Sequence, residues 1–160
     1  MNTADRRGVI AFLSPAAINL NLTGSDRESV LSELVNLVPG LTDPQQKQTL
    51  LKALLDREQL HSTGIGDGVA LPHCRNALVG LVDHPILVFG RHPAGIAYGS
   101  IDNAPAKLFF LLVAPTVTEH LALLARLGRL LRDPKTRQEL LAAATPDAAL
   151  ATIKKAEGRM

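Results

Sequence analysis

The chain has 160 residues, which is enough for one domain of ordinary size but leaves no room for a second large module. With 46% hydrophobic and 20% charged residues it can bury a substantial core, which excludes disorder as its main state. The formal net charge is only +2, far from the basic surface that binding to a phosphate backbone needs, so we expect no nucleic-acid partner. No apolar stretch approaches the roughly 18 residues of a membrane span, so we expect no membrane insertion either.

The composition favours helices and an aliphatic core. Leu and Ala supply 28 and 21 residues, whereas the chain holds four Phe, one Tyr and no Trp. The single cysteine, Cys74, excludes an intramolecular disulfide and indicates a reducing, cytoplasmic setting. The apolar run at residues 9–13 is too short for the core of a signal peptide, which takes roughly 7–15 residues.

Two helices are predicted in the first part of the chain. Ser25 and Glu28 have the spacing of a capping box, and apolar residues then recur at helical spacing until Pro39. Asp43 followed directly by Pro44 is typical of a second helix start, and this helix should end near residue 60.

Strands are predicted in the middle of the chain. Residues 62–68 are so rich in glycine that we expect a loop, followed by a short strand over 69–71. The runs 78–89 and 108–113 are rich in Val, Ile, Phe and Leu and predict two buried strands. Between them, residues 93–103 should form a loop or hairpin.

Three more helices are predicted after residue 115, with N-caps at Thr118, Asp133 and Thr145. The last two caps are each followed by proline, which suits the first position of a helix. The element order therefore predicts a single α/β domain over residues 1–160, with its core at about 10–157. In this sandwich, helices cover both faces of a sheet.

The glycine cluster at Gly64, Gly66 and Gly68 does not have the pattern of a nucleotide site. A dinucleotide fingerprint needs Gly-x-Gly-x-x-Gly after a strand and before a helix, and here a helix precedes the glycines and a strand follows them. Glycines in this position instead allow the backbone to approach a neighbouring group closely, so we expect them to shape a pocket.

His73 is the strongest candidate for a reactive side chain because it follows a strand end beside the glycine cluster. A neutral imidazole is a good nucleophile near physiological pH. The other candidates are His120, near a helix start that favours an anion, and Arg57, whose planar guanidinium suits a phosphate. Together they would make a phosphoryl site with a nucleophile, a donor and a cation.

Plainer interpretations of these residues stay open. His120 could be a solvated residue of the first helical turn, and Arg57 could simply pair with Asp56 or Glu58. We expect the three remaining histidines to be ordinary surface or core residues: His61, His84 and His92.

Thiol, metal and serine-hydrolase sites are less favoured. His73 and Cys74 are adjacent, so in a strand their side chains would point to opposite faces and could not readily share a metal ion. Cys74 lies in no recognisable nucleophile motif, and the Gly-x-Ser-x-Gly pattern of the α/β-hydrolases is absent.

Two segments, Asp-Arg-Glu-Gln-Leu at 56–60 and Ser-Thr-Gly-Ile-Gly-Asp-Gly-Val-Ala-Leu-Pro-His at 62–73, carry a family resemblance. They closely resemble the phosphorylation segment of the fructose/mannitol-type enzyme IIA domains of the bacterial phosphotransferase system. The stretches 101–103, 108–115 and 119–133 are similar to the rest of that pattern, so the resemblance covers about residues 10–155. The length and the glycine motif are most similar to the nitrogen-regulatory branch of the family.

The resemblance implies that His73 accepts a phosphoryl group from the phosphohistidine of a small HPr-type carrier, and that His120 and Arg57 steady that group. It also implies a mixed sheet, and a pocket shaped by Thr63 and the glycine cluster. No metal or cofactor is expected, because the donor already carries an activated phosphoryl group. Cys74 departs from the glycine that often follows the phosphorylated histidine, and this leaves the nucleophile intact.

The regulatory interpretation has two rivals. A sugar-specific IIA component would pass its phosphate to the IIB domain of a permease. A binding regulator that acts without phosphorylation could use Arg126, Arg129 and Arg132, which are spaced along one helix face. In the regulatory case, transient docking to regulated target proteins is expected.

Overall fold

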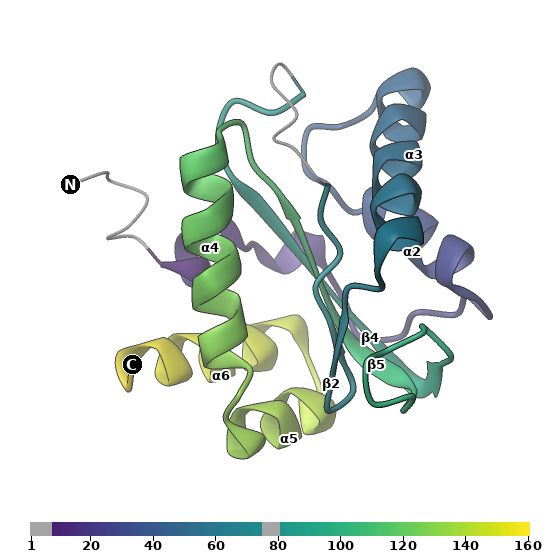
Figure 1. Cartoon of the computed structure of the whole chain (residues 1–160). Coiled ribbons are helices and arrows are strands. Elements are labelled where there is room, and N and C mark those ends of the chain that lie inside the picture. The colour runs from purple at the N-terminus through teal and green to yellow at the C-terminus, as the bar shows by residue number, and fades with distance from the viewer. Residues whose placement is uncertain (1–7, 75–80) are drawn as a thin grey trace.

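A computed structural model describes residues 8–74 and 81–160 of the chain (Figure 1). The residues 78–80 of one predicted strand lie outside this part. The short N-terminal 3-10 turns are η1 (Val9–Phe12) and η2 (Pro15–Ala17), the helices are α2 (Arg27–Val35), α3 (Pro44–Leu60), α4 (Val117–Leu130), α5 (Pro134–Ala142) and α6 (Pro146–Gly158), and the strands are β1 (Ile18–Asn19), β2 (Gly64–Gly66), β3 (Val69–Ala70), β4 (Ile86–Ile96) and β5 (Ala106–Val113).

The strands form one mixed sheet in the order β1-β4-β5-β3-β2. β1 runs parallel to β4 and β3 parallel to β5, whereas β4 pairs antiparallel with β5 and β2 antiparallel with β3. Figure 1 shows α2 and α3 on one side of the sheet and α4, α5 and α6 on the other. The predicted α/β sandwich with a mixed sheet is therefore confirmed. Within the described ranges, no helix has the length and apolar character needed to cross a membrane.

The two central strands carry the core on both faces. Every residue from Leu108 to Val113 is buried, as the unbroken apolar run predicted. Phe89 of β4 stacks on Phe110 of β5 with ring centroids 4.5 Å apart, and Phe109 makes an edge contact with Tyr98 at 5.4 Å. Because Phe109 and Phe110 are neighbours in one strand, these two aromatic pairs lie on opposite faces of the sheet.

The glycine-rich segment is a β-hairpin, so the expectation of an irregular loop was wrong. β2 and β3 pair across Asp67 and Gly68, whose φ angles are +57° and +78°. Two consecutive positive φ values are typical of a type I′ turn, for which Asp-Gly is a preferred sequence. The Asp67 N–H donates to the Asp102 carboxylate at 3.0 Å and so fixes the turn against the segment before β5.

Two predicted helix caps were wrong by one or two residues. The capping box of α2 joins Asp26 and Ser29 instead of Ser25 and Glu28: the Ser29 N–H donates to the Asp26 carboxylate at 2.8 Å. The N-cap of α4 is Thr116 instead of Thr118. The caps that are each followed by proline are confirmed at Asp43, Asp133 and Thr145.

The segment between the two long strands is the turn of an antiparallel hairpin, as the hairpin alternative predicted. The predicted strand at 78–89 was wrong at both ends within the described residues, because β4 begins at Ile86 and continues to Ile96. His92, in this part of β4, is buried, and its Nδ1 accepts the Gly95 N–H at 3.0 Å. Its Nε2 therefore carries the proton and donates to the Gly24 carbonyl at 2.8 Å. This confirms His92 as a core histidine with both ring nitrogens satisfied.

A single carboxylate joins the first described residues to the C-terminal helix. Glu157 of α6 accepts the N–H groups of Val9 and Ile10, each at 2.8 Å. It also accepts Arg126 Nε of α4 at 3.0 Å, and its side chain is only 9% exposed. Glu157 thus satisfies two backbone donors at the start of η1 and one side chain of α4.

Replacing Glu157 with Ala should lower the free energy of unfolding by about 1–3 kcal/mol, because it leaves buried donors unpaired. Urea unfolding measures the change. The matched control is Glu139→Ala, since Glu139 is a half-exposed carboxylate on α5, and it should stay within about 0.5 kcal/mol of the parent. Equal losses in the two variants would contradict the assigned role.

Candidate phosphoryl site

The sheet topology brings three distant segments to one edge of the sheet. Because β3 and β5 are parallel, the residues after β3, including His73, lie at the same edge as the residues after β5, which lead into α4 and His120. β2 runs antiparallel to β3 and so starts at this edge, directly after the last turn of α3 with Arg57. The three residues predicted from the sequence therefore belong to one region.

His73 is held by its own backbone in an orientation that leaves one ring nitrogen free. It extends the parallel pairing with β5 opposite Leu112, whose N–H donates to the Pro72 carbonyl at 3.1 Å. His73 Nδ1 lies 2.6 Å from the Leu71 carbonyl oxygen. A carbonyl oxygen can only accept, so Nδ1 carries the proton and Nε2 carries the lone pair.

His120 lies next to His73, with ring centroids 5.2 Å apart and an interplanar angle of 57°. Its side chain is buried, so it is not the solvated residue of the plainer interpretation. Its backbone N–H donates to the Thr116 carbonyl at 3.0 Å, because helix α4 starts earlier than expected. His120 can therefore contribute only its imidazole to the site.

Arg57 lies in the last turn of α3, close enough for its charge to act on His73. One guanidinium nitrogen donates to the His61 carbonyl at 2.6 Å. The plainer interpretation, a pairing with Asp56 or Glu58, is not found, and within the described residues Arg57 forms no ion pair. Burial lowers the pKa of His73, and the positive charge of Arg57 lowers it further.

Both histidines are neutral at physiological pH. Burial lowers the pKa of His73 below its ordinary value; the hydrogen bond to Leu71 opposes this shift and the charge of Arg57 adds to it. Burial also lowers the pKa of His120, and neighbouring His73 adds to that effect. A neutral His73 with its lone pair on Nε2 is the nucleophilic form of the ring.

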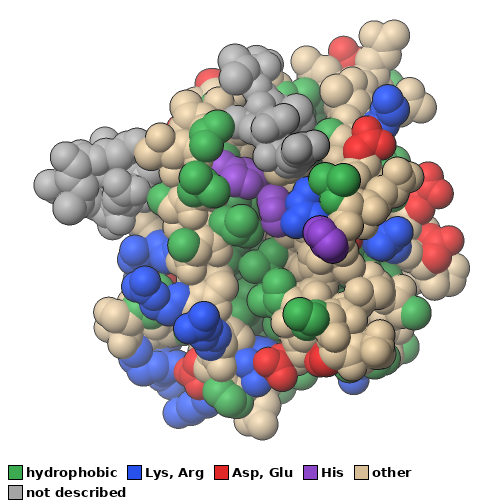
Figure 2. All heavy atoms as spheres, in the orientation of Figure 1, with side chains coloured by type: hydrophobic (Ala, Val, Ile, Leu, Met, Phe, Trp, Pro, Cys, Tyr) green, Lys and Arg blue, Asp and Glu red, His purple; other side chains and the backbone are tan. Residues whose placement is uncertain are grey.

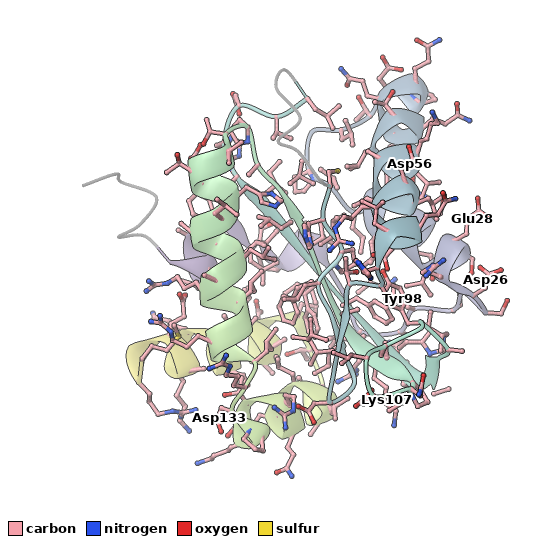
Figure 3. The ribbon with its side chains drawn as sticks, viewed as in Figure 1. Asp26, Glu28, Asp56, Tyr98, Lys107 and Asp133 are labelled. Carbon is pink, nitrogen blue, oxygen red and sulfur yellow. The ribbon has the colours of Figure 1, made fainter. Side chains whose placement is uncertain are left out.

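The Thr63 side chain is buried and faces Glu58 and Tyr98. Its backbone N–H donates to Glu58 Oε1 at 2.9 Å and its hydroxyl donates to Glu58 Oε2. The Tyr98 hydroxyl, labelled in Figure 3, lies 3.3 Å from the Thr63 hydroxyl. Reasoning from the sequence missed Glu58 and Tyr98 here. One signal was present, since Glu58 continues the buried stripe of Leu50 and Leu54 at a spacing of four.

The three glycines shape the hairpin that borders the site. A Cβ atom at position 64 would lie 3.0 Å from the Ser100 Cα atom, so a larger residue would displace the backbone there. Gly66 and Gly68 have φ angles of +93° and +78°, which side chains rarely tolerate.

Cys74, directly after His73, is buried, and burial raises the pKa of its thiol to about 12. The reactive thiolate is therefore suppressed, in keeping with the low weight given to Cys74 as a nucleophile.

The surface around the histidines is apolar. Figure 2 shows histidine side chains gathered beside a basic side chain, with hydrophobic side chains extending away from them. α3, β2 and the first turns of α4 expose large apolar residues, namely Leu60, Ile65, Val117 and Leu121. Between β2 and α4 a groove of about 620 Å³ is lined by these elements, with Arg129 and Arg132 at its α4 side. Arg126, the third residue of the predicted arginine stripe, is bonded to Glu157 instead.

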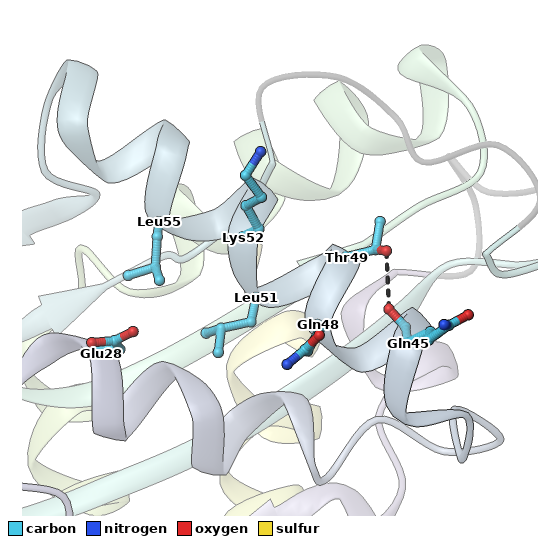
Figure 4. A pocket seen from close by; sticks show the side chains of 7 residues that line it. All are labelled: Glu28, Gln45, Gln48, Thr49, Leu51, Lys52 and Leu55. Carbon is cyan, nitrogen blue, oxygen red and sulfur yellow. Dashed lines mark hydrogen bonds between the residues drawn. The ribbon is translucent and has the colours of Figure 1, made fainter.

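A second groove, of about 550 Å³, lies between α2 and α3 (Figure 4). Glu28 and Lys52 are its charged residues, and Thr49 donates to the Gln45 carbonyl at 3.0 Å. It contains no histidine or cysteine, so it offers no comparable chemistry. Among the residues that the structure describes, no group of three His, Cys, Asp or Glu side chains could hold a metal ion.

The titration of His73 is expected to have its midpoint below the usual histidine value of about 6.5. The unfolded chain then binds more protons than the folded protein as the pH falls through 6.5, so the free energy of unfolding decreases below about pH 7. NMR titration of the ring gives the midpoint. Urea unfolding of His73→Gln should show a weaker loss of stability between pH 7 and 5, whereas a midpoint above 6.5 would contradict the burial of a neutral ring.

Comparison with known proteins identifies the family. The family model described as phosphoenolpyruvate-dependent sugar phosphotransferase system, EIIA 2, matches residues 11–156. The nitrogen regulatory protein of Pseudomonas aeruginosa is 35% identical over 86% of this chain and 88% of its own length. The fructose-specific EIIABC component of Bacillus subtilis is also 35% identical over 91% of this chain, which spans only 23% of that relative.

Solved structures agree with this assignment. Nitrogen regulatory protein IIA-Ntr from Neisseria meningitidis superposes with a TM-score of 0.78 at 26% identity, covering 90% of this chain and 97% of that one. IIA mannitol from Escherichia coli shares the fold, with a TM-score of 0.74 at 23% identity over 88% of this chain and 97% of that one. This chain therefore belongs to the EIIA 2 family of the phosphoenolpyruvate-dependent sugar phosphotransferase system.

Proposed function

We propose that this IIA-type phosphocarrier accepts a phosphoryl group on Nε2 of His73 from the phosphohistidine of an HPr-type protein. One observation supports this most directly: the hydrogen bond from Nδ1 to the Leu71 carbonyl leaves Nε2 of the half-buried His73 ring unprotonated. The family resemblance implies the partner and the roles of the site residues. The geometry around His73 supports its role as the acceptor.

The proposed transfer needs no proton to be added or removed at His73. The lone pair of His73 Nε2 attacks phosphorus in line while the bond from phosphorus to the donor nitrogen breaks, and the donor imidazole takes that electron pair. As the bond forms, positive charge grows on the His73 ring. The Leu71 carbonyl, 2.6 Å from Nδ1, stabilises that charge through the existing hydrogen bond.

His120 and Arg57 would stabilise the transferred group. The His120 ring is buried beside His73 and neutral, so one of its nitrogens can donate to a phosphoryl oxygen. Arg57 uses one nitrogen on the His61 carbonyl and has further N–H groups for the phosphoryl oxygens. The donor phosphohistidine is already activated, so the proposed chemistry uses no metal or cofactor.

Partner proteins would dock on the apolar surface around the site. α3, β2 and the first turns of α4, which contribute to the site region, expose large apolar side chains, and such side chains suit transient protein contacts. Phosphoryl exchange with HPr-type carriers would place the protein in the cytoplasm.

A nitrogen-regulatory role is favoured over a sugar-specific one. The regulatory relative from Pseudomonas aeruginosa matches over 88% of its own length, so it consists of little more than this domain. A fructose-specific EIIA component of similar extent, from Haloferax volcanii, matches over 81% of its own length at 31% identity, below the 35% of the regulatory relative. As a nitrogen regulator, the protein would signal through its phosphorylation state and dock transiently on regulated target proteins.

Incubation with phosphorylated HPr-type carrier should add one phosphate to the parent protein and none to His73→Ala, as intact-mass measurement shows. His120→Ala and Arg57→Ala should slow the transfer by about 10²–10³-fold, because each removes one donor to the developing charge. The matched control is His61→Ala, which removes an exposed histidine near the site and should leave the rate unchanged. Phosphate uptake by His73→Ala at the parent rate would overturn the assignment.

A mixing experiment separates the regulatory role from the sugar-specific one. The protein, phosphorylated with radiolabelled phosphate, is mixed with a purified fructose-type IIB domain. The regulatory role predicts that the label stays on this chain over a period in which a fructose-specific IIA control transfers most of its label. Transfer at the rate of the control would favour the sugar-specific role.

A further inference from the structure

We propose that Glu58 is a positioning residue that fixes the reactive tautomer of His73 through Thr63 and Leu71. The proposal rests on the proposed function of His73 as phosphoacceptor. It assigns a task to a carboxylate that neither the transfer step nor the docking surface uses.

Glu58 is a carboxylate buried without a cation. It is 4% exposed, and within the described part of the chain it forms no ion pair. Both of its oxygens are occupied by one residue, because Oε1 accepts the Thr63 N–H at 2.9 Å and Oε2 accepts the Thr63 hydroxyl. Burying a carboxylate costs free energy that these bonds must offset, so its position calls for an explanation beyond packing.

Two further hydrogen bonds lead from Thr63 to the reactive ring. The Thr63 carbonyl accepts the Leu71 N–H at 3.0 Å. The Leu71 carbonyl accepts the Nδ1–H of His73 at 2.6 Å. Glu58 thus holds Thr63, Thr63 holds Leu71, and Leu71 determines which nitrogen of His73 carries the proton.

Tyr98 restricts Thr63 from the other side. The Thr63 hydroxyl gives its proton to Glu58, so it can accept from the Tyr98 hydroxyl 3.3 Å away. The Tyr98 carbonyl accepts the Ser62 hydroxyl at 2.8 Å, and its ring packs on Phe109. Thr63 therefore has one rotamer that satisfies both neighbours, and it cannot turn toward a phosphoryl group without breaking them.

The tautomer matters because only a ring with its lone pair on Nε2 can attack phosphorus at that nitrogen. Without Glu58, the segment from Thr63 to Leu71 would lose its anchor at the Thr63 end, and the Leu71 carbonyl could move away from Nδ1. The ring would then populate the form with the proton on Nε2, which cannot accept phosphate there.

The test measures the His73 tautomer by ¹⁵N NMR in the parent protein and in Glu58→Ala, Glu58→Gln and Thr63→Val. We expect the parent to hold its proton on Nδ1 alone, and Glu58→Ala to show both tautomers together with phosphoryl transfer slowed about 10–100-fold. Glu58→Gln should be milder, because its amide oxygen can still accept the Thr63 N–H. Thr63→Val keeps that backbone donor, so it should also change the tautomer and the transfer rate less than Glu58→Ala does.

The matched control is Thr136→Val, which removes a buried hydroxyl that donates to Asp133 at 3.0 Å in α5. It should lower stability without changing the tautomer. Should Glu58→Ala not fold, Glu58→Gln and Thr63→Val decide the question. A parent-like tautomer and rate in the folded variants would overturn the proposal.

The tautomer is measured without any phosphate, so the two proposals can fail separately. If the parent protein takes up no phosphate on His73, the proposed function fails while the tautomer data still test Glu58. If His73 is phosphorylated but Glu58→Ala keeps the parent tautomer and rate, only the positioning role fails.

Discussion

The parallel pairing of β3 with β5 is the constraint on which the candidate site depends. It places the end of β3 beside the end of β5, so His73 meets the helix that carries His120. The antiparallel hairpin of β2 and β3 then returns the chain to the same edge, where α3 ends with Arg57. A different register at this point would separate the two histidines even if every helix formed as it does.

Arg57 and Glu58, neighbours of opposite charge at the end of α3, have different surroundings and different roles. Successive positions on a helix point about 100° apart, so Arg57 and Glu58 face different surroundings. Glu58 turns inward and is satisfied by a neutral threonine, while the charge of Arg57 acts on His73 and has no anionic partner among the described residues. If the two paired with each other, the site would lose its cation. The burial that keeps both histidines neutral also strengthens the effect of that cation on a bound phosphoryl group.

Local signals allowed most of the fold to be predicted. The helices with proline after the cap begin where the sequence indicated, because capping and the fixed φ of proline act within a few residues. The glycine-rich hairpin was missed because glycine is usually unfavourable in strands, although Asp67-Gly68 carried a turn signal. The extension of β4 to Ile96 depends on pairing with Ala106 of β5, which no local pattern shows.

Part of the candidate site could also be predicted from the sequence, whereas the part that depends on tertiary packing could not. His73, His120 and Arg57 were identified by residue type, position and family resemblance, and the structure brings them to one edge of the sheet. The link from Glu58 through Thr63 to Leu71 could not be predicted, because it depends on how α3 packs against a hairpin. The inward direction of the Thr63 side chain comes from the same packing.

The central claim is that the backbone holds His73 so that Nε2 is the nucleophile. A correlation between ³¹P and the ¹⁵N nuclei of the ring in the phosphorylated protein tests it most directly. The account predicts coupling of phosphorus to Nε2 of His73, with the proton retained on Nδ1 against the Leu71 carbonyl. Coupling to Nδ1, or to another histidine, would contradict it.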